Sequence, residues 1–326
     1  MNAALATRLT FALLLLAVLP LHADTVESPM WISSQSPLQS LHLGLLPAVP
    51  RDLAPGEIST ERSETWTNVW IDQRPELLID YEAVDSRLGV SIGLRRSMQL
   101  QIALEDRTGT GGKLDSLIEN FHHLIGNRDD RHTVNRDTVN IELRDPKTGA
   151  LIASRHSLGP FSRAASATLS KRYAFGPDQL AAAVSVRIPR RGSDRLGPGG
   201  LDSGISLAWS GLIRGRSLHA GAGLSRLSNP YIGPLRVGRI EKTLFVAAAQ
   251  PMTTRTALIA QYLFNASIAE SGPLASGSHE VTLGTRVHLT RYTAFDVGLV
   301  ENIINLNNGP DFGFHFGLIH NTTRRR

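Results

Sequence analysis

The stretch GTGGKLDSLIENFHHLIG, from Gly109 to Gly126, combines glycines, a lysine and two adjacent histidines, which are residue types that serve phosphate and metal sites. A Walker phosphate loop needs Gly-Lys followed by Ser or Thr. Here Leu114 follows the Gly-Lys pair, so the phosphate interpretation fails. Glu119 and His122 have the Glu-x-x-His spacing of di-iron bundles, which need a second copy and two further Glu ligands. The sequence shows no second copy, so we expect no metal and no other cofactor.

A second pattern, Gly89 to Gly93, fits the Gly-x-Ser-x-Gly elbow of hydrolases. That elbow exposes its serine at a sharp turn between a strand and a helix. Ser91 instead lies within an alternating segment that continues into another such segment, so we expect a mid-strand serine and no catalytic residue. Scattered Ser and His residues leave a lipid-acting enzyme open as an alternative, because a catalytic triad is defined by geometry and not by sequence position.

The N-terminus has the features of a secretory signal peptide. Arg8 precedes an apolar run from Leu9 to Leu19, and Pro20 and Ala23 follow. We therefore predict a cleaved signal peptide over residues 1–23 and export of the rest. No later apolar run reaches the length of a membrane-spanning helix. The chain has no cysteine, which excludes disulfides and thiolate zinc sites.

The charge balance gives no indication of a nucleic-acid partner. The chain has 34 Lys and Arg against 29 Asp and Glu. Its basic residues are scattered, apart from Arg190-Arg191 and the terminal Arg324 to Arg326, and no aromatic residues interleave with them. We expect no binding of DNA or RNA.

Strict alternation of apolar and polar residues dominates the middle of the chain. In LGVSIGLRRSMQLQIAL, Leu88 to Leu104, apolar residues occupy every second position on both sides of a short turn. Successive strand side chains point to opposite faces, so this segment reads as a hairpin with one apolar face. The opposite face carries small or polar residues, as a wet lumen requires: Arg87, Gly89, Ser91, Gly93, Gln99, Gln101 and Glu105.

The same alternation recurs in three later segments. Leu218 to Leu224 alternate with His219 to Ser225, Val281 to Leu289 with Glu280 to His288, and Phe312 to Leu318 with Asp311 to Gly317. Arg286, His288 and His315 fall on the polar faces. An all-β chain follows from this pattern.

Short and long connections alternate between these segments, which is typical of an outer-membrane barrel with short periplasmic turns and long external loops. We predict a closed antiparallel up-and-down transmembrane β-barrel of about 12 to 14 strands, with 14 favoured and 12 expected if one hairpin lies outside the membrane. A soluble secreted β-sandwich is the alternative, because its strands also alternate between a core face and a water face.

We divide the chain into a signal peptide (1–23), an N-terminal periplasmic or plug-like segment (24–60), the barrel (61–320) and a basic tail (321–326). The last strand is expected to end near Leu318. The longest external loop is predicted to contain one short amphipathic helix that ends at Gly126. Its apolar residues recur at helical spacing: Leu114, Leu117, Ile118, Phe121, Leu124 and Ile125.

Five sequence segments resemble a family of bacterial outer-membrane proteins of unknown function, the domain-of-unknown-function family 3187. They are SPLQSLHLGLLP, RLGVSIGLRRSMQLQIALE, GGKLDSLIENFHHLIGNRDDR, FDVGLVENI and PDFGFHFGL. The third segment is similar to the family's Gly-x-Leu-Asp then Ile-Glu-x-Phe-His signature. The resemblance implies an outer-membrane barrel of a Gram-negative bacterium but no activity or ligand. The charged C-terminal tail departs from the aromatic end that barrel assembly usually uses.

These observations favour a channel or uptake pore for a small or hydrophobic solute. The candidate ligand contacts lie in the loop helix and on the lumen faces: Asp115, Glu119, His122, Arg87, Arg286, His288 and His315. The expected partners are outer-membrane lipid and lipopolysaccharide, the barrel-assembly machinery and a small solute. A barrel enzyme acting on lipid or lipopolysaccharide and a structural or adhesive surface barrel are the alternatives.

Overall fold

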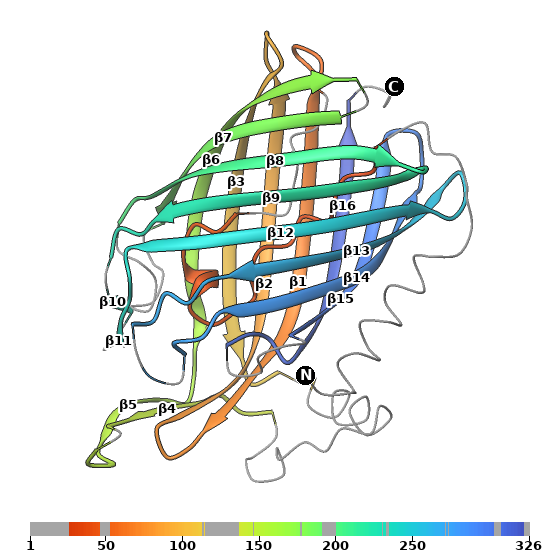
Figure 1. Cartoon of the computed structure of the whole chain (residues 1–326). Coiled ribbons are helices and arrows are strands. Elements are labelled where there is room, and N and C mark those ends of the chain that lie inside the picture. Colours follow the sequence, from red (N-terminus) through yellow and green to blue (C-terminus); the bar gives the residue numbers. More distant parts are fainter. Residues whose placement is uncertain are drawn as a thin grey trace.

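The structure is a computed structural model that describes residues 26–45, 53–112, 114, 137–145, 147–176, 178–190, 200–229, 231–232, 235–270, 272, 274–302 and 308–322. Its main feature is one antiparallel sheet of 14 strands, in which β1 (Ile58–Gln73) pairs with both β2 (Leu77–Gly93) and β16 (Phe312–Asn321). This double pairing closes the sheet into a ring (Figure 1). Closure satisfies the backbone hydrogen bonds at both edges of the sheet. Two separate packed sheets, as in a sandwich, do not describe this arrangement.

Twelve strands make up the ring, because β4 and β5 are the two members of the 14-stranded sheet that lie outside it. Every neighbouring pair is antiparallel, and most ring strands follow one another in the sequence. Their bounds are β1 (Ile58–Gln73), β2 (Leu77–Gly93), β3 (Met98–Thr110), β6 (Gly159–Phe175), β7 (Asp178–Pro189), β8 (Asp202–Ile213), β9 (Arg216–Arg226), β12 (Ile240–Pro251), β13 (Thr256–Asn265), β14 (Ser278–His288), β15 (Thr293–Asn302) and β16 (Phe312–Asn321).

The preference for 14 barrel strands is wrong, and the reason lies in β4 (Asn140–Arg144) and β5 (Leu151–Arg155). Each has 5 residues, whereas a transmembrane strand needs about 9–11. The β4 strand pairs with the first residues of β2, Leu77 to Asp80, where β2 has extended past the ring. The two short strands therefore form a hairpin beyond the barrel, as Figure 1 shows at the lower left.

The two ends of the barrel differ. At one end the turns are short: residues 94–97, 176–177, 214–215, 252–255 and 289–292. At the other end lie the long connections, the β4–β5 hairpin and the small β10 (Tyr231–Ile232) and β11 (Leu235–Arg236) pair. We call these the short-turn end and the long-loop end. In outer-membrane barrels they face the periplasm and the outside, respectively.

The loop helix predicted before Gly126 lies outside the described residues. Within the described residues the helical element is η1 (Gln39–Leu41), a single 3-10 turn in the N-terminal segment that the sequence did not predict. No helix among these residues is long and apolar enough to cross a membrane. The last strand, β16, ends at Asn321, three residues beyond the expected end at Leu318.

The alternation of side chains is confirmed on the barrel wall. On β14, Leu283 is exposed outward whereas Glu280 and Arg286 are buried inside the ring. On β16, Phe316 and Leu318 face outward whereas His315 is buried. Outward apolar side chains thus cover the surface that lipid would contact, and polar ones fill the interior. Ser91 lies within β2, in agreement with the rejection of a hydrolase elbow.

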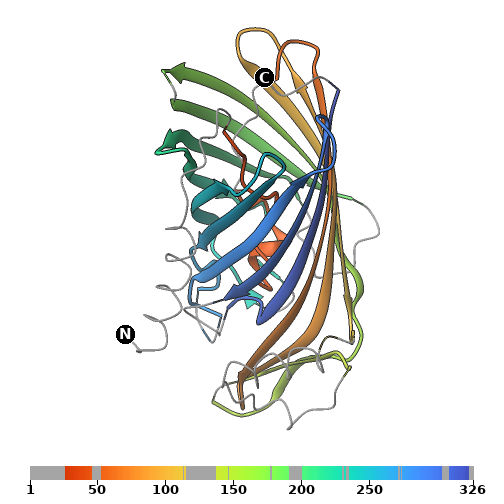
Figure 2. The same ribbon diagram turned by 90° about the vertical axis from the view of Figure 1, so that its right-hand side faces the viewer.

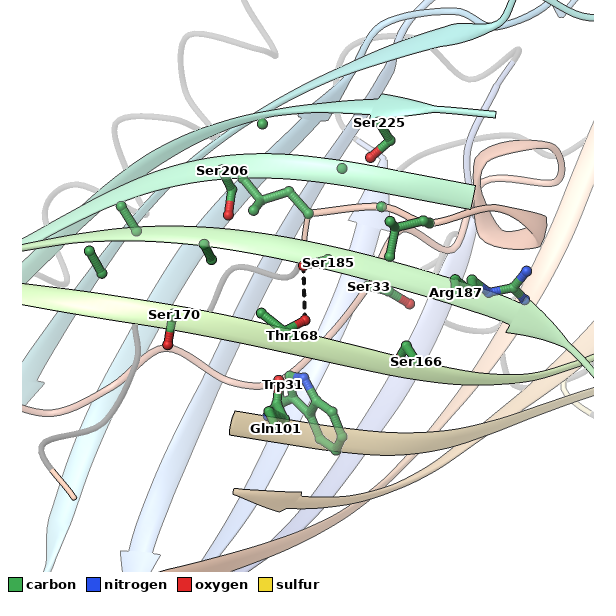
Figure 3. Close-up of a pocket in the computed structure, with 18 of the residues that line it drawn as sticks. Trp31, Ser33, Gln101, Ser166, Thr168, Ser170, Ser185, Arg187, Ser206 and Ser225 are labelled. Atoms are coloured by element: carbon green, nitrogen blue, oxygen red, sulfur yellow. Dashed lines mark hydrogen bonds between the residues drawn. The ribbon is translucent and has the colours of Figure 1, made fainter. Parts of the chain in front are cut away.

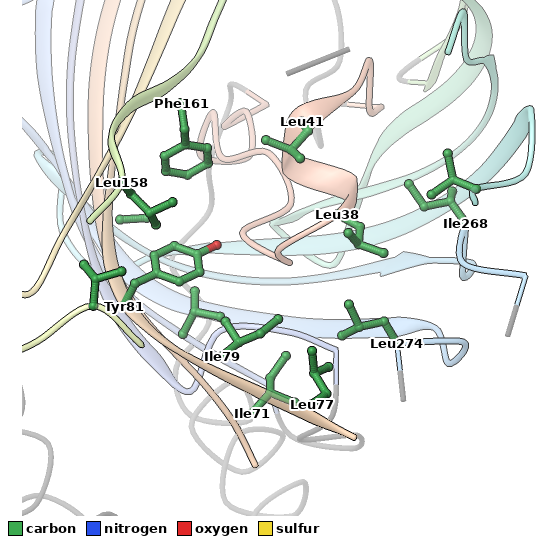
Figure 4. Close-up of a cluster of buried hydrophobic side chains, with 14 of the residues drawn as sticks. Leu38, Leu41, Ile71, Leu77, Ile79, Tyr81, Leu158, Phe161, Ile268 and Leu274 are labelled. Atoms are coloured by element: carbon green, nitrogen blue, oxygen red, sulfur yellow. The ribbon is translucent and has the colours of Figure 1, made fainter. Parts of the chain in front are cut away.

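A buried apolar cluster fills the long-loop end of the lumen (Figure 4). Ile71 on β1 and Ile79 and Tyr81 on β2 belong to it, and Leu38 and Leu41 reach it from the turn of η1. On β2 the inward residues change from apolar, up to Ala83, to polar from Asp85 onward. The inward face of β2 is therefore apolar near the long loops and polar towards the short-turn end, whereas β8 and β14 place the buried Asp202 and Glu280 near the long loops.

Candidate functional site

The N-terminal segment, residues 26–45, lies inside the barrel as a loop, which we call the inserted segment (Figure 2). Glu27 contacts Ser217 and His288, which adjoin short turns. The turn η1 lies at the long-loop end, where Gln39 donates a hydrogen bond to the carbonyl of Ala266. The chain then turns back, and by Ala54 it is again beside Gly93 at the short-turn end.

Arg286 anchors the first part of the inserted segment. Its guanidinium group makes two hydrogen bonds of 2.7 Å to the carboxylate of Asp296 on β15. It also bonds the carbonyl of Ser28 at 2.9 Å and lies 3.4 Å from a carboxylate oxygen of Glu27. His288 lies 3.0 Å from the other oxygen of that carboxylate. Arg286 is fully buried, and a buried charge is tolerated only when it is paired and hydrogen-bonded in this way.

A second anchor holds residues 33 to 35 against β2 and β14. Asp85 accepts hydrogen bonds of 3.2 Å from both Ser33 and Gln35. Arg87 donates to Ser33 at 2.5 Å and pairs with Asp85. Glu280 accepts a hydrogen bond of 2.8 Å from the backbone amide of Gln35. Each bond joins the inserted segment to a charged side chain of the wall, and such bonds are about twice as strong as neutral ones.

The far part of the inserted segment is held by β7 and β8. Arg187 donates to the carbonyl of Leu41 at 2.7 Å. The carboxylate of Asp202 lies 3.3 Å from a ring nitrogen of His42 and accepts a hydrogen bond of 3.2 Å from the amide of Leu43. The segment is therefore attached along its length, and the attachments come from opposite walls.

Glycines on the wall make room for two large side chains of the inserted segment. A Cβ added to Gly89 would lie 2.5 Å from the indole ring of Trp31. A Cβ added to Gly284 would collide with Met30. Trp31 and Met30 are both almost fully buried. Glycine at these positions is thus required by close packing of side chain against backbone.

The strands β6 to β8 form a different kind of wall, with small side chains on the inside. Ser166, Thr168 and Ser170 follow one another on β6, and Thr168 is 2.9 Å from Ser185 on β7 (Figure 3). Ser206 continues the row on β8. These hydroxyls, together with Trp31 and Gln99, line a cavity of about 110 Å³ between the wall and the inserted segment.

The burial of the inward residues shows where this space lies. Inward residues of β1 such as Thr65 and Thr67 are buried, as is Arg286 on β14. Ser166, Thr168, Ser185 and Ser206, although they point inward, are only half-buried. The inserted segment therefore packs closely against the strands that carry Thr65, Thr67 and Arg286, and the cavity lies on the side of β6 to β8.

The structure separates the predicted site residues. Arg286 and His288 meet at Glu27, and Arg87 contacts Ser33. His315 faces the lumen, where its Nδ1 lies 2.9 Å from the hydroxyl of Thr65. Of these four residues, Arg87 lines the cavity. Asp115, Glu119 and His122 lie outside the described residues.

The sequence-based predictions missed the residues that line the cavity. The serines of FSRAASATLSKR recur at every fourth position, and Thr168 lies two residues after Ser166, which places these hydroxyls on one face of a strand. This spacing could have indicated the lining from the sequence. No sequence pattern marks Trp31 in this way, because its position depends on contacts with Gly89, a wall residue 58 positions later in the chain.

No group of three or more His, Asp or Glu side chains within the described residues is arranged to hold a metal ion. The lumen charges are instead used in pairs, such as Arg286 with Asp296 and Arg187 with Glu105, which lie 2.7 and 3.0 Å apart. The site is therefore a cavity lined by hydroxyl groups and paired charges.

Comparison with protein families identifies the relatives of this chain. The profile described as "Protein of unknown function (DUF3187)" matches residues 7–322. The chain belongs to the DUF3187 family. A comparison of this DUF3187 chain with curated proteins finds no match.

Solved structures share the fold of this DUF3187 chain. The "COG4313 outer membrane channel from Pseudomonas putida F1" is similar with a TM-score of 0.54 and 12% identity, over 84% of this chain and 99% of that one. A structure named "NanC porin" has a TM-score of 0.48 and 7% identity, over 80% of this chain and 98% of that one. The likeness to the Pseudomonas putida channel shows that this chain shares the fold of that protein.

Proposed function

We propose that this DUF3187 protein is an outer-membrane channel for small solutes, and that solutes cross between the inserted segment and the inner wall of β6 to β8. The observation that carries the proposal is the cavity of about 110 Å³ in that position. Half-buried serine and threonine hydroxyls on the wall agree with a wet passage.

The lining favours a polar solute over the hydrophobic solute that the sequence left open. Ser166, Thr168, Ser185 and Ser206 present hydroxyl groups to the cavity. A hydrophobic solute would remove water from these groups without replacing their hydrogen bonds, which costs free energy. We therefore assign the passage to small hydrophilic molecules.

The inserted segment sets the width of the passage in this proposal. The apolar cluster around Leu38, Leu41 and Tyr81 narrows the long-loop end, and the charged anchors hold the segment in place. The channel is thus narrow at rest, and wider states require movement of the inserted segment.

The apolar outer face of the barrel supports a location in the outer membrane. We infer that the protein is exported with cleavage of residues 1–23 and assembled in the outer membrane of a Gram-negative bacterium. There it would contact lipid and lipopolysaccharide after insertion by the assembly machinery. We propose transport without a chemical step, so no residue is given a catalytic role.

Ion conductance of the purified protein in planar bilayers tests the proposal. Ser185 points into the passage and its neighbour Val184 points outward with 56% exposure. Ser185→Trp fills the passage and should lower the conductance several-fold. Val184→Trp places the same side chain on the lipid side and should leave the conductance unchanged. A wild-type protein that folds but does not conduct would overturn the proposed function. Equal effects of the two substitutions on the conductance would show that the passage does not run along Ser185.

A further inference from the structure

Three polar atoms of residues that line the lumen cavity have no hydrogen-bond partner in the part of the chain that the structure describes. They are the indole Nε1 of Trp31, the side-chain oxygen of Gln99 and the Nε2 of His42. Trp31 is 2% exposed and Gln99 is 9% exposed, and both line the cavity. Buried polar groups are nearly always hydrogen-bonded, so each such atom calls for an explanation. One explanation is a molecule bound in the cavity that supplies the missing hydrogen-bond partners. The position of these residues at the cavity supports it.

We propose that this cavity is a binding site for a small neutral polyhydroxylated molecule, a polyol or a small sugar. The proposal rests on the channel function and names the class of its solute. The indole Nε1 can only donate a hydrogen bond, and the oxygen of Gln99 can only accept one. A hydroxyl group both donates and accepts, so a polyol carries the kind of partner that each atom needs.

The charges around the cavity favour a neutral ligand. Two acidic side chains, Glu61 and Glu105, and two arginines, Arg87 and Arg187, line it. His42 also lines it, and its Nδ1 lies 3.3 Å from the carboxylate of Asp202. Arg187 lies 3.0 Å from Glu105, and Arg87 lies 3.3 Å from Asp85. Paired charges leave little net potential for attracting an anion or a cation. The lining therefore selects by hydrogen bonds and not by charge.

The remaining wall suits the same ligand class. Ser166, Thr168, Ser170 and Ser206 supply hydroxyls along one side of the cavity (Figure 3). Counted as the space open to the centre of a water molecule, the cavity measures about 110 Å³. One water needs about 10–15 Å³ by that measure, so roughly eight water-sized groups fit. This number is near that of the heavy atoms in a four- or five-carbon polyol.

The test is a titration of the wild-type channel with xylitol, with gluconate and a short polyethylene glycol as comparison solutes. Conductance is recorded in planar bilayers, and binding is measured by calorimetry on the same protein in detergent. We expect xylitol to reduce the current saturably and to bind in calorimetry, whereas gluconate and the glycol do neither. The conductance recorded without any added solute tests the channel function separately from the binding site.

Two substitutions locate the site. Gln99→Leu removes the acceptor at little change in volume, and Trp31→Phe removes the donor together with part of the ring, so each should weaken xylitol binding by about threefold to tenfold. Trp209→Phe, on the wall strand β8, is the matched control and should leave binding unchanged. Each variant is first checked for the heat-dependent shift of a closed barrel.

The outcomes separate the two proposals. A channel that conducts but shows no saturable effect of xylitol, and no heat of binding, would overturn this inference and leave the channel intact. In that case water alone satisfies Trp31 and Gln99. Binding in calorimetry without conductance would overturn the proposed function and keep the site.

Discussion

Glu27 offers the sharpest test of how the inserted segment is held. Its carboxylate lies 3.4 Å from Arg286 and 3.0 Å from His288, and its side chain is 10% exposed. Glu27→Gln keeps the shape and removes the charge. A hydrogen bond to a charged group contributes about 1.5–3 kcal/mol and a neutral one about 0.5–1.5 kcal/mol. The substitution should therefore favour release of the segment by about 1–2 kcal/mol, which is roughly a fivefold to thirtyfold change in the equilibrium.

Two measurements detect this shift in the equilibrium between the held and the released segment. In single-channel recordings, the fraction of time spent in wider states should rise by that factor. The chain has no cysteine, so Ile32→Cys introduces one thiol, at a position that is 3% exposed inside the lumen. Its labelling by a membrane-impermeant reagent should accelerate by the same factor when Glu27→Gln is added.

The control is a glutamate whose ion pair lies on the surface. Glu270 lies 3.1 Å from Arg236, and both side chains are largely exposed, so the pair contributes about 0–1 kcal/mol. Glu270→Gln should change neither measurement. If Glu27→Gln also matched the wild type in both, the charged contacts of Glu27 would not hold the segment, and the reasoning would be refuted.

Three further predictions follow from the fold. Gly89→Ala should destabilise the barrel by about 1–3 kcal/mol through overpacking against Trp31, seen as a lower midpoint of the heat-dependent electrophoretic shift, whereas Gly44→Ala, with nothing within 4 Å, should not. The unboiled wild type should migrate differently from the boiled protein because the ring is closed; identical migration would contradict closure. Replacing residues 140–155 with a short linker should keep the shift, since β4 pairs only with Leu77 to Asp80 of the ring strand β2; loss of the shift would assign the hairpin a structural role.

The strands of the barrel wall were predictable because the pattern that defines them is local in the sequence. Side chains alternate along each strand, and lipid on one side and polar groups on the other impose that period directly on the sequence. Glu280 and Arg286 on β14 and His315 on β16 were placed on the lumen face for this reason. The period does not distinguish a ring strand from the short β4 and β5, which led to the count of 14.

The contents of the lumen were not predictable in the same way. Gln35 is buried by contacts with Asp85, Glu280 and Arg107, which come from three different strands. No spacing in the sequence encodes such a set, because each partner is distant along the chain. A segment with few charges and several serines was therefore read only as plug-like, with its contacts unspecified.

The path of the inserted segment also bears on how the barrel is assembled. Glu27 and Ala54 both lie near the short-turn end, by their contacts with Ser217 and Gly93. Both of these residues therefore lie at the same mouth of the ring, and η1 lies between them at the other mouth. The wall can close first and receive the inserted segment afterwards, or fold around it. A pull applied at the short-turn mouth would withdraw the inserted segment while every pair of ring strands stays joined.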